Sequence, residues 1–178
     1  MSQPRSLYIH VPFCAHRCGY CDFTLVAGKD HLAEKYLDAL SLEIDRELAR
    51  VDNSDSAAHS NLQLDTVFFG GGTPTQLTAQ QLERLCGIVQ DRFQLTPETE
   101  FSVEANPAGM TDDRITVLAE AGVNRISLGV QSFDDETLTM LERDHRQADV
   151  FDCVDRVKAR IENISLDLIF AVPGQSLE

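Results

Sequence analysis

Two hydrophobic periodicities alternate along the chain. Apolar residues occupy every second position, or form a short run, in five segments that predict strands at 7–11, 66–70, 100–105, 125–131 and 164–172. Between them, apolar residues recur three and four positions apart. This spacing predicts helices at 32–50, 111–121, 134–142 and 148–161, and one that begins at Thr78 and turns Leu82, Leu85, Val89 and Phe93 inward. Alternating strands and helices imply parallel strands joined by right-handed crossovers.

Local signals support two of these helix ends. Thr78 and Gln81 have the spacing of a capping box, and Gly122 is a suitable residue to end the helix at 111–121. Residues 52–61 are small and polar, which predicts a surface connection.

Five parallel strands fit either a barrel or a doubly wound sheet. Strands of a doubly wound sheet are covered by helices on both faces and read as continuous apolar runs. Here each strand has one apolar face and one face with polar groups near its C-terminal end. The polar faces hold Tyr8 and His10; Ser102, Glu104 and Asn106; Ser127, Gly129 and Gln131; and Ser165, Asp167 and Ile169. We therefore predict an α/β fold that is a partial (β/α) TIM-like barrel, with function at the C-terminal ends of the strands.

Glu104 is the strongest single indication of a site on that face. A carboxylate inside a strand is costly unless it is paired or used for binding. A purely structural salt bridge to Arg125 is the alternative interpretation.

Composition and charge argue against several classes of partner. The chain has 178 residues, 43% of them hydrophobic and 25% charged, and a formal net charge of −14. This acidity argues against nucleic acid and anionic membrane as partners. No apolar run approaches the roughly 18 residues of a membrane span, so we expect a cytoplasmic protein. Because the chain stops where a sixth unit is due, we expect residues 1–178 to be the N-terminal part of a core domain whose C-terminal domain lies outside this chain.

Three of the five cysteines, Cys14, Cys18 and Cys21, follow the first strand closely. Such a cluster is typical of a metal or redox site rather than of a disulfide framework. A structural zinc ion would need a fourth ligand, for which only His10 and His16 are near. A [4Fe–4S] cluster usually has four cysteines, so three would leave one iron open. Cys86 and Cys153 fall on helix faces that we expect in the core.

The segment "GGGTPT" after the second strand lacks both the Lys of a P-loop and the spacing of a dinucleotide fold. Its glycines allow a ligand to approach the backbone closely, although a tight structural turn would use them too.

Together, "YIHVPFC", Cys-x₃-Cys-x₂-Cys, "FFGGGTPT", "EANP", "GVNRISLGVQSF" and "LDLIFAVPGQ" resemble the radical S-adenosylmethionine (SAM) proteins of the oxygen-independent coproporphyrinogen III oxidase-like group. The resemblance covers nearly the whole chain. It implies a radical SAM barrel in which Cys14, Cys18 and Cys21 hold a [4Fe–4S] cluster whose fourth iron is open to SAM. It further implies that SAM contacts Tyr8, Tyr20, Gly71, Gly72, Thr73, Glu104, Gln131, Arg143 and Asp167. Glycine N–H and C=O groups suit the amino-acid end of SAM, acidic side chains suit its amino and hydroxyl groups, and Arg143 suits its carboxylate. No catalytic residue is assigned.

That group contains two functional types. The true oxidases resemble this chain but carry a further cysteine two positions after the third, where this chain has Phe23. "Cys-Asp-Phe" is more similar to the HemW-type haem chaperones, which implies binding of haem and its transfer to acceptor haem proteins. Coproporphyrinogen III oxidase, which would make the protein an enzyme of porphyrin biosynthesis, remains the alternative.

Haem or porphyrin, acceptor haem proteins and an electron donor for the cluster are the partners that the resemblance implies. The main haem site of such chaperones would fall beyond residue 178. We expect His10, His16, His31, His59 and His145 to be polar rim or surface residues.

Overall fold

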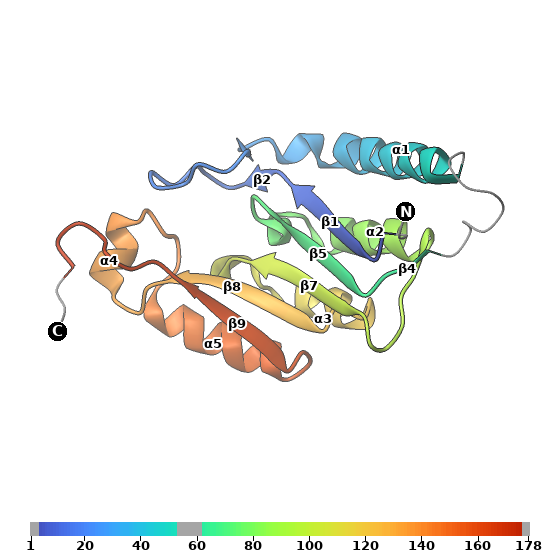
Figure 1. The fold of residues 1–178 in the computed structure, drawn as a ribbon. Coiled ribbons are helices and arrows are strands. Elements are labelled where there is room, and N and C mark those ends of the chain that lie inside the picture. Colours follow the sequence, from blue (N-terminus) through green and yellow to red (C-terminus); the bar gives the residue numbers. More distant parts are fainter. Residues whose placement is uncertain (1–3, 53–61, 176–178) are drawn as a thin grey trace.

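The computed structural model describes residues 4–52 and 62–175. A single five-stranded parallel sheet organises them, with the strands in the order β1-β5-β7-β8-β9. These strands are β1 (Ser6–Val11), β5 (Thr66–Gly71), β7 (Glu100–Ala105), β8 (Arg125–Gln131) and β9 (Asn163–Leu168). Each strand is added beside the preceding one along the chain, whereas a doubly wound sheet reverses its order at a switch point. The predicted parallel α/β fold with sequential strands is confirmed (Figure 1).

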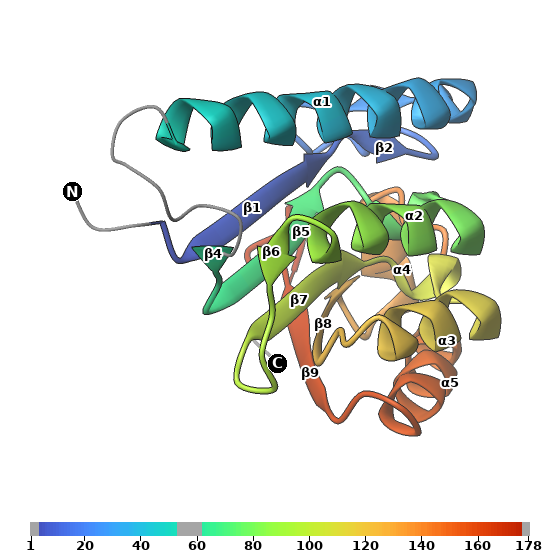
Figure 2. The same cartoon turned by 90° about the vertical axis from the view of Figure 1, so that its right-hand side faces the viewer.

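Helices cover one face of this sheet (Figure 2). They are α1 (Ala33–Asp52), α2 (Ala79–Gln90), α3 (Asp112–Glu120) and α5 (Gln147–Lys158), whereas α4 (Asp135–Met140) lies beyond the end of β8 (Figure 1). Short 3₁₀ turns at Asp30–Leu32, Pro74–Gln76 and Pro107–Gly109 precede α1, α2 and α3. None of the described helices combines the length and apolar character that crossing a bilayer requires.

The core lies between the helices and the face of the sheet on which the alternating apolar strand residues lie. Phe69 and Phe101 meet edge to face there with their ring centroids 5.0 Å apart, in the same core cluster as Leu82 and Leu85 of α2. Cys86 and Cys153 are also part of this core, as predicted. The other parity faces the concave, helix-free side, so the predicted division of each strand into two faces is correct.

The predicted helix ends are also largely correct. The capping box of Thr78 and Gln81 is formed, and Gly122 has a φ of 81°, which suits the residue that follows a helix. Phe93 does not extend α2 but lies in β6 (Phe93–Gln94), which pairs with β4 (Leu62–Gln63). Residues 53–61 of the predicted surface connection lie outside the described residues.

The last predicted strand is too long. β9 ends at Leu168 rather than at residue 172, and Ala171 adopts a positive φ of 62° that is incompatible with a strand. No described helix follows β9, so the helix-side residues Leu166, Leu168 and Phe170 are exposed by 40%, 56% and 85%. The described part of the chain does not bury these three side chains.

Candidate functional site

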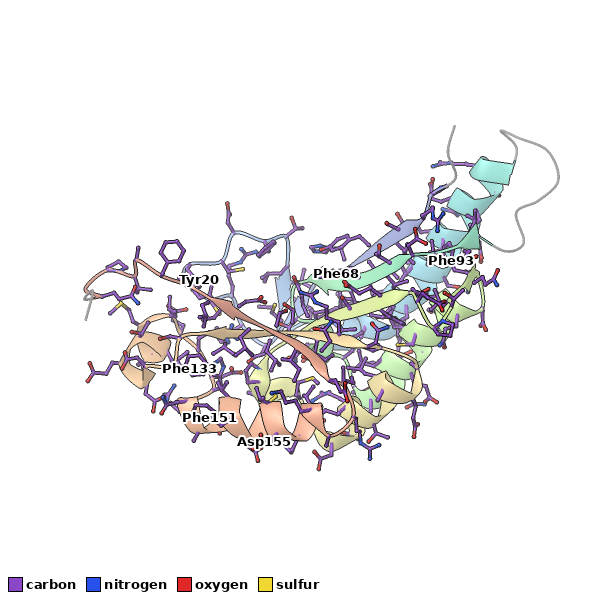
Figure 3. All side chains as sticks on the ribbon, turned by 60° about the horizontal axis from the view of Figure 1, so that its bottom comes forward. Tyr20, Phe68, Phe93, Phe133, Phe151 and Asp155 are labelled. Atoms are coloured by element: carbon purple, nitrogen blue, oxygen red, sulfur yellow. The ribbon has the colours of Figure 1, made fainter. Side chains whose placement is uncertain are left out.

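A cavity of about 540 Å³ opens at the C-terminal ends of the strands. Its wall includes all three cysteines of the predicted cluster and nearly every predicted SAM-contacting residue: Tyr20, Gly71, Gly72, Thr73, Glu104, Gln131, Arg143 and Asp167. Figure 3 shows Tyr20 over the end of the sheet where β8 and β9 finish, far from Phe93 at the opposite end. The fold thus brings residues from six separate segments to one cavity.

The Cys loop (residues 14–22) begins at a short two-stranded parallel sheet. In this sheet β2 (Phe13–Cys14) pairs with β3 (Val26–Ala27), so the residues just after the loop lie beside those at its start. The Cys14 Sγ atom lies 3.4 Å from the hydroxyl of Thr73. Burial raises the pKa of the Cys14 thiol, the contact with Thr73 opposes that rise, and the neighbouring Cys21 and Cys18 add to it. The three thiols therefore share one environment.

The arrangement of the thiols distinguishes a zinc ion from a [4Fe–4S] cluster. Among the described residues, no three His, Cys, Asp or Glu side chains lie close enough to share one metal ion. A structural zinc ion needs four such side chains around a single point. A [4Fe–4S] cluster is bound differently, because each thiolate ligates a different iron. Three cysteines spread along one cavity wall fit the cluster.

The glycine turn is packed against the strand that leads into the Cys loop. A Cβ atom on Gly72 would lie 2.8 Å from the Phe13 carbonyl oxygen, and one on Gly71, whose φ is 107°, would lie 2.5 Å from the His10 ring. The N–H groups of Gly71, Gly72 and Thr73 donate to Glu104, Val11 and Phe13 at 3.0, 2.8 and 2.8 Å. These three N–H groups therefore already have acceptors within the protein. Their carbonyl oxygens remain candidate acceptors.

Glu104 and Asp167 place two carboxylates on the cavity wall. Glu104 is paired with the turn and not with Arg125, which instead lies 3.9 Å from Glu100. Burial raises the pKa of Glu104, the Gly71 N–H lowers it, and Asp167 raises it. The hydroxyl of Ser127 donates to Asp167 at 3.0 Å. Both carboxylates keep lone pairs for amino or hydroxyl donors of a ligand.

Arg143 and Asn106 carry buried polar atoms that the protein does not satisfy. The guanidinium of Arg143 donates to the Gly129 carbonyl at 2.8 Å and to the Tyr20 hydroxyl at 3.3 Å, but its Nε–H has no acceptor in the described part of the chain. The Asn106 Oδ1 atom likewise has no donor there. Buried polar atoms are normally paired, so the cavity suits a ligand that offers both an acceptor and a donor. The amino-acid end of SAM has this character.

Of the remaining predicted SAM contacts, Gln131 lies on the cavity wall and Tyr8 does not. Gln131 has a positive φ of 66° at the end of β8, and its carbonyl oxygen accepts from the Ile169 N–H at 2.9 Å. Tyr8 is not part of the cavity wall. It stacks on Phe68 with ring centroids 6.0 Å apart, and its hydroxyl lies 3.2 Å from His10 Nδ1. Burial, and then the negative charge of Glu104, raises the pKa of Tyr8.

Asp144 lies in the wall but was not predicted from the sequence, and Asn106 and Gly129 were assigned to the polar strand faces without a role in binding. The parity of β7 and the motif "EANP" already contained a signal for Asn106. His145 was wrongly expected at the surface: it is fully buried, and its Nε2 donates to the Val130 carbonyl at 3.0 Å. No sequence pattern marks this loop as buried. His59 lies outside the described residues.

Comparisons with known proteins agree with this geometry. The family model of the radical SAM superfamily matches residues 8–178. Among curated relatives, the heme chaperone HemW of Lactococcus lactis is 42% identical over 100% of this chain and 44% of that protein. The proteins of the same name from Bacillus subtilis and Escherichia coli are 42% and 36% identical, each over 98% of this chain. The chain spans less than half the length of these relatives.

Solved structures show the same fold. Coproporphyrinogen III oxidase (HemN) from Escherichia coli, described as a radical SAM enzyme, superimposes with a TM-score of 0.84 at 31% identity, over 96% of this chain and 38% of that one. Elp3 from Methanocaldococcus infernus, with a TM-score of 0.55 and 17% identity, shares the fold alone. These matches confirm the predicted partial radical SAM barrel.

Proposed function

The chain belongs to the radical SAM superfamily, and from this we propose that it is part of a haem chaperone that binds a [4Fe–4S] cluster and SAM. The observation that carries the proposal is the shared cavity. It contains three thiols of one loop together with the unsatisfied Arg143 Nε–H and the carboxylate of Glu104. A bound cluster supplies an electron and an iron with an open coordination position.

In this proposal the residues of the cavity bind different groups of the cluster and of SAM. Cys14, Cys18 and Cys21 hold the cluster. Arg143 offers its Nε–H to the carboxylate of SAM, and Glu104, with Asp167, accepts from its amino or ribose hydroxyl groups. Tyr20, held by Arg143 at 3.3 Å, closes the wall above them. Gly71, Gly72, Thr73 and Gln131 contribute carbonyl or side-chain contacts, and Tyr8 supports the site from behind Glu104.

The cluster assignment is tested by serine variants of the cysteines. Replacing Cys14, Cys18 or Cys21 with Ser should abolish the visible absorbance of the anaerobically reconstituted cluster. Cys86→Ser is the matched control, since Cys86 is buried in the core, and it should leave the absorbance unchanged. If Cys86→Ser also destroyed the cluster, the model with three ligands would be wrong.

Haem transfer rather than porphyrinogen oxidation is proposed from Phe23 and from the names of the relatives. Phe23 lies on the cavity wall and is 64% exposed, at the position where the oxidases carry a further cysteine. The relatives at 42% identity are named heme chaperones. We propose that the main haem site lies outside this chain, as the resemblance implies; within the chain, His10, His16 and His145 each already bind a backbone carbonyl. Acceptor haem proteins and an electron donor are the further partners of this proposal, and the cytoplasm is its location.

The test uses the full-length protein under anaerobic, reducing conditions. Titration with haem should produce a saturable Soret band, and mixing with an acceptor apoprotein should move that band to the acceptor. Absence of haem binding would contradict the chaperone. Formation of protoporphyrinogen IX from coproporphyrinogen III, with 5′-deoxyadenosine as co-product, would instead establish the oxidase.

A further inference from the structure

Four consecutive residues between α4 and α5 bind the Cys loop and the ends of β7 and β8. We call residues 142–145 the bracket. Arg143 donates to Tyr20 in the Cys loop and to the Gly129 carbonyl in β8. Asp144 Oδ1 accepts from the Asn106 side chain, which follows β7, at 3.0 Å. This short segment contacts both the Cys loop and the ends of β7 and β8. Its position therefore determines how the Cys loop lies relative to these strand ends.

The first residue of the bracket, Glu142, binds the Cys loop at two points. Its carbonyl oxygen accepts from His16 Nε2 at 2.7 Å, and its side-chain Oε2 accepts from the Gly19 N–H at 3.0 Å. The same carbonyl oxygen lies 3.9 Å from the sulfur of Cys18. These contacts join residues more than 120 positions apart in sequence, on either side of a proposed cluster ligand.

Glu142 adopts a backbone conformation that is unfavourable for its residue type. Its φ is 55°, in the left-handed region that non-glycine residues rarely occupy. Such strain persists where the surrounding contacts determine the conformation. Gly19 is matched to it, because a Cβ atom there would lie 3.2 Å from the carboxylate of Glu142. The side chain and the loop therefore fit each other closely.

The last residue of the bracket fixes it to the sheet. His145 is fully buried and donates to Val130, next to Gln131 at the cavity wall. The neighbouring His145 ring, with the Asn106 amide, holds the pKa of Asp144 well below its usual range, so Asp144 remains an ionised acceptor. One end of the bracket is thus anchored in the core while the other end holds the exposed Cys loop.

We propose that Glu142 is a positioning residue, which holds the Cys loop in the conformation that accepts the cluster and does so before the cluster arrives. A loop whose three thiolates bind three different irons loses conformational freedom on loading, and a loop that is already held loses less. Within the loop, the Cys21 N–H donates to the Cys18 carbonyl oxygen at 3.0 Å, and the Arg17 guanidinium donates to the Cys21 carbonyl oxygen at 3.2 Å. The two contacts of Glu142 attach the centre of the loop to the rest of the protein, in addition to the contacts of Tyr20 with Arg143 and of Cys14 with Thr73. This inference rests on the proposed cluster site.

The first experiment measures cluster retention in the full-length reconstituted protein. Glu142→Ala removes the acceptor for Gly19 but keeps a Cβ atom, so the backbone strain is unchanged. Loss of the cluster to a chelator, followed by visible absorbance, should be about fivefold faster, as expected for losing one hydrogen bond to an exposed charged group. Glu142→Gln keeps a side-chain oxygen acceptor and should restore most of the retention. Glu83→Ala, at an exposed position of α2, is the matched control and should behave as wild type.

The second experiment uses the apo-protein, so it does not depend on the cluster. Hydrogen exchange at the peptide that contains Gly19 should be faster in Glu142→Ala than in wild type, with Tm unchanged within two degrees of the Glu83→Ala control. A wild type that takes up no iron and sulfide would refute the proposed function, whereas the exchange result decides the role of Glu142 by itself. Unchanged exchange at Gly19 would overturn the inference. A Tm lowered by several degrees and not restored by Glu142→Gln would also overturn it, since the residue would then be structural.

Discussion

Gly72 is the position where the cavity depends most directly on the absence of a side chain. A Cβ atom there would lie 2.8 Å from the carbonyl oxygen of Phe13 and the carbonyl carbon of Pro12, and 2.9 Å from the oxygen of Val11. All three are backbone atoms, which cannot rotate away as a flexible side chain can. Gly72→Ala should therefore separate the glycine turn from the strand end that leads into the Cys loop.

The magnitude follows from the contacts that this separation weakens. Ordinary contact begins at 3.4 Å, so the two segments must move apart by about 0.6 Å. That movement stretches the bonds from the Gly72 and Thr73 N–H groups to Val11 and Phe13, both 2.8 Å long. Each such bond has a net worth of about 1 kcal/mol, so we expect Gly72→Ala to lower the free energy of unfolding by about 2 kcal/mol.

Urea unfolding of the apo-protein, followed by circular dichroism, measures this loss. Gly87→Ala in α2 is the control, because a Cβ atom there meets no other atom within 4 Å. Alanine is the better helix former, so this control should gain about 0.5–1 kcal/mol. Gly72→Ala should also load less iron and sulfide, since Thr73 adjoins the Cys14 sulfur. A free energy of unfolding within about 0.5 kcal/mol of wild type would refute this reasoning about the turn.

Three further predictions concern buried titratable groups. Burial raises the pKa of Glu104, so folding favours its protonated form, and the stability of the wild type should fall as pH rises from the unfolded pKa to the folded one. Glu104→Gln should flatten this fall in urea titrations at several pH values and bind SAM more weakly at pH 7; an unchanged pH profile would contradict it. Burial raises the pKa of Cys86 to about 12 and that of Cys153 to about 11, so both should resist alkylation at pH 8 until the protein is denatured, as mass spectrometry can show. Rapid labelling of either thiol in the native protein would be inconsistent with the fold. His145→Leu removes the donor to Val130 and should weaken SAM binding measured by calorimetry, while His145→Gln retains a donor and should recover it in part; equal affinities would show that the anchor has no effect on the site.

The sheet could be predicted from the sequence because alternation along a strand is a local property. Glu100–Ala105 and Arg125–Gln131 match the predicted bounds, and their two faces are as expected. The end of β9 at Leu168 could not be predicted, because apolar residues continue to Val172 and the turn at Ala171 depends on backbone conformation rather than on residue type.

The sequence led to residues that share one cavity, but not to the contacts between them. Cys14 and Glu104 lie in recognisable motifs, whereas Arg143 lies in none of them and follows only from the resemblance. The contact between Glu142 and the Cys loop joins segments more than 120 residues apart, and no periodicity encodes such a pair. The burial of His145 also arises only when α5 packs against the sheet.

The central claim is a [4Fe–4S] cluster with three cysteine ligands and one iron open to SAM. Electron paramagnetic resonance of the reduced, reconstituted protein with and without SAM tests it most directly. We expect chemical analysis to find about four irons and four sulfides per chain, in line with the cluster type. We also expect the paramagnetic resonance spectrum to change when SAM is added. A preparation that holds zinc instead of iron and sulfide, or a cluster whose spectrum SAM leaves unaltered, would contradict it.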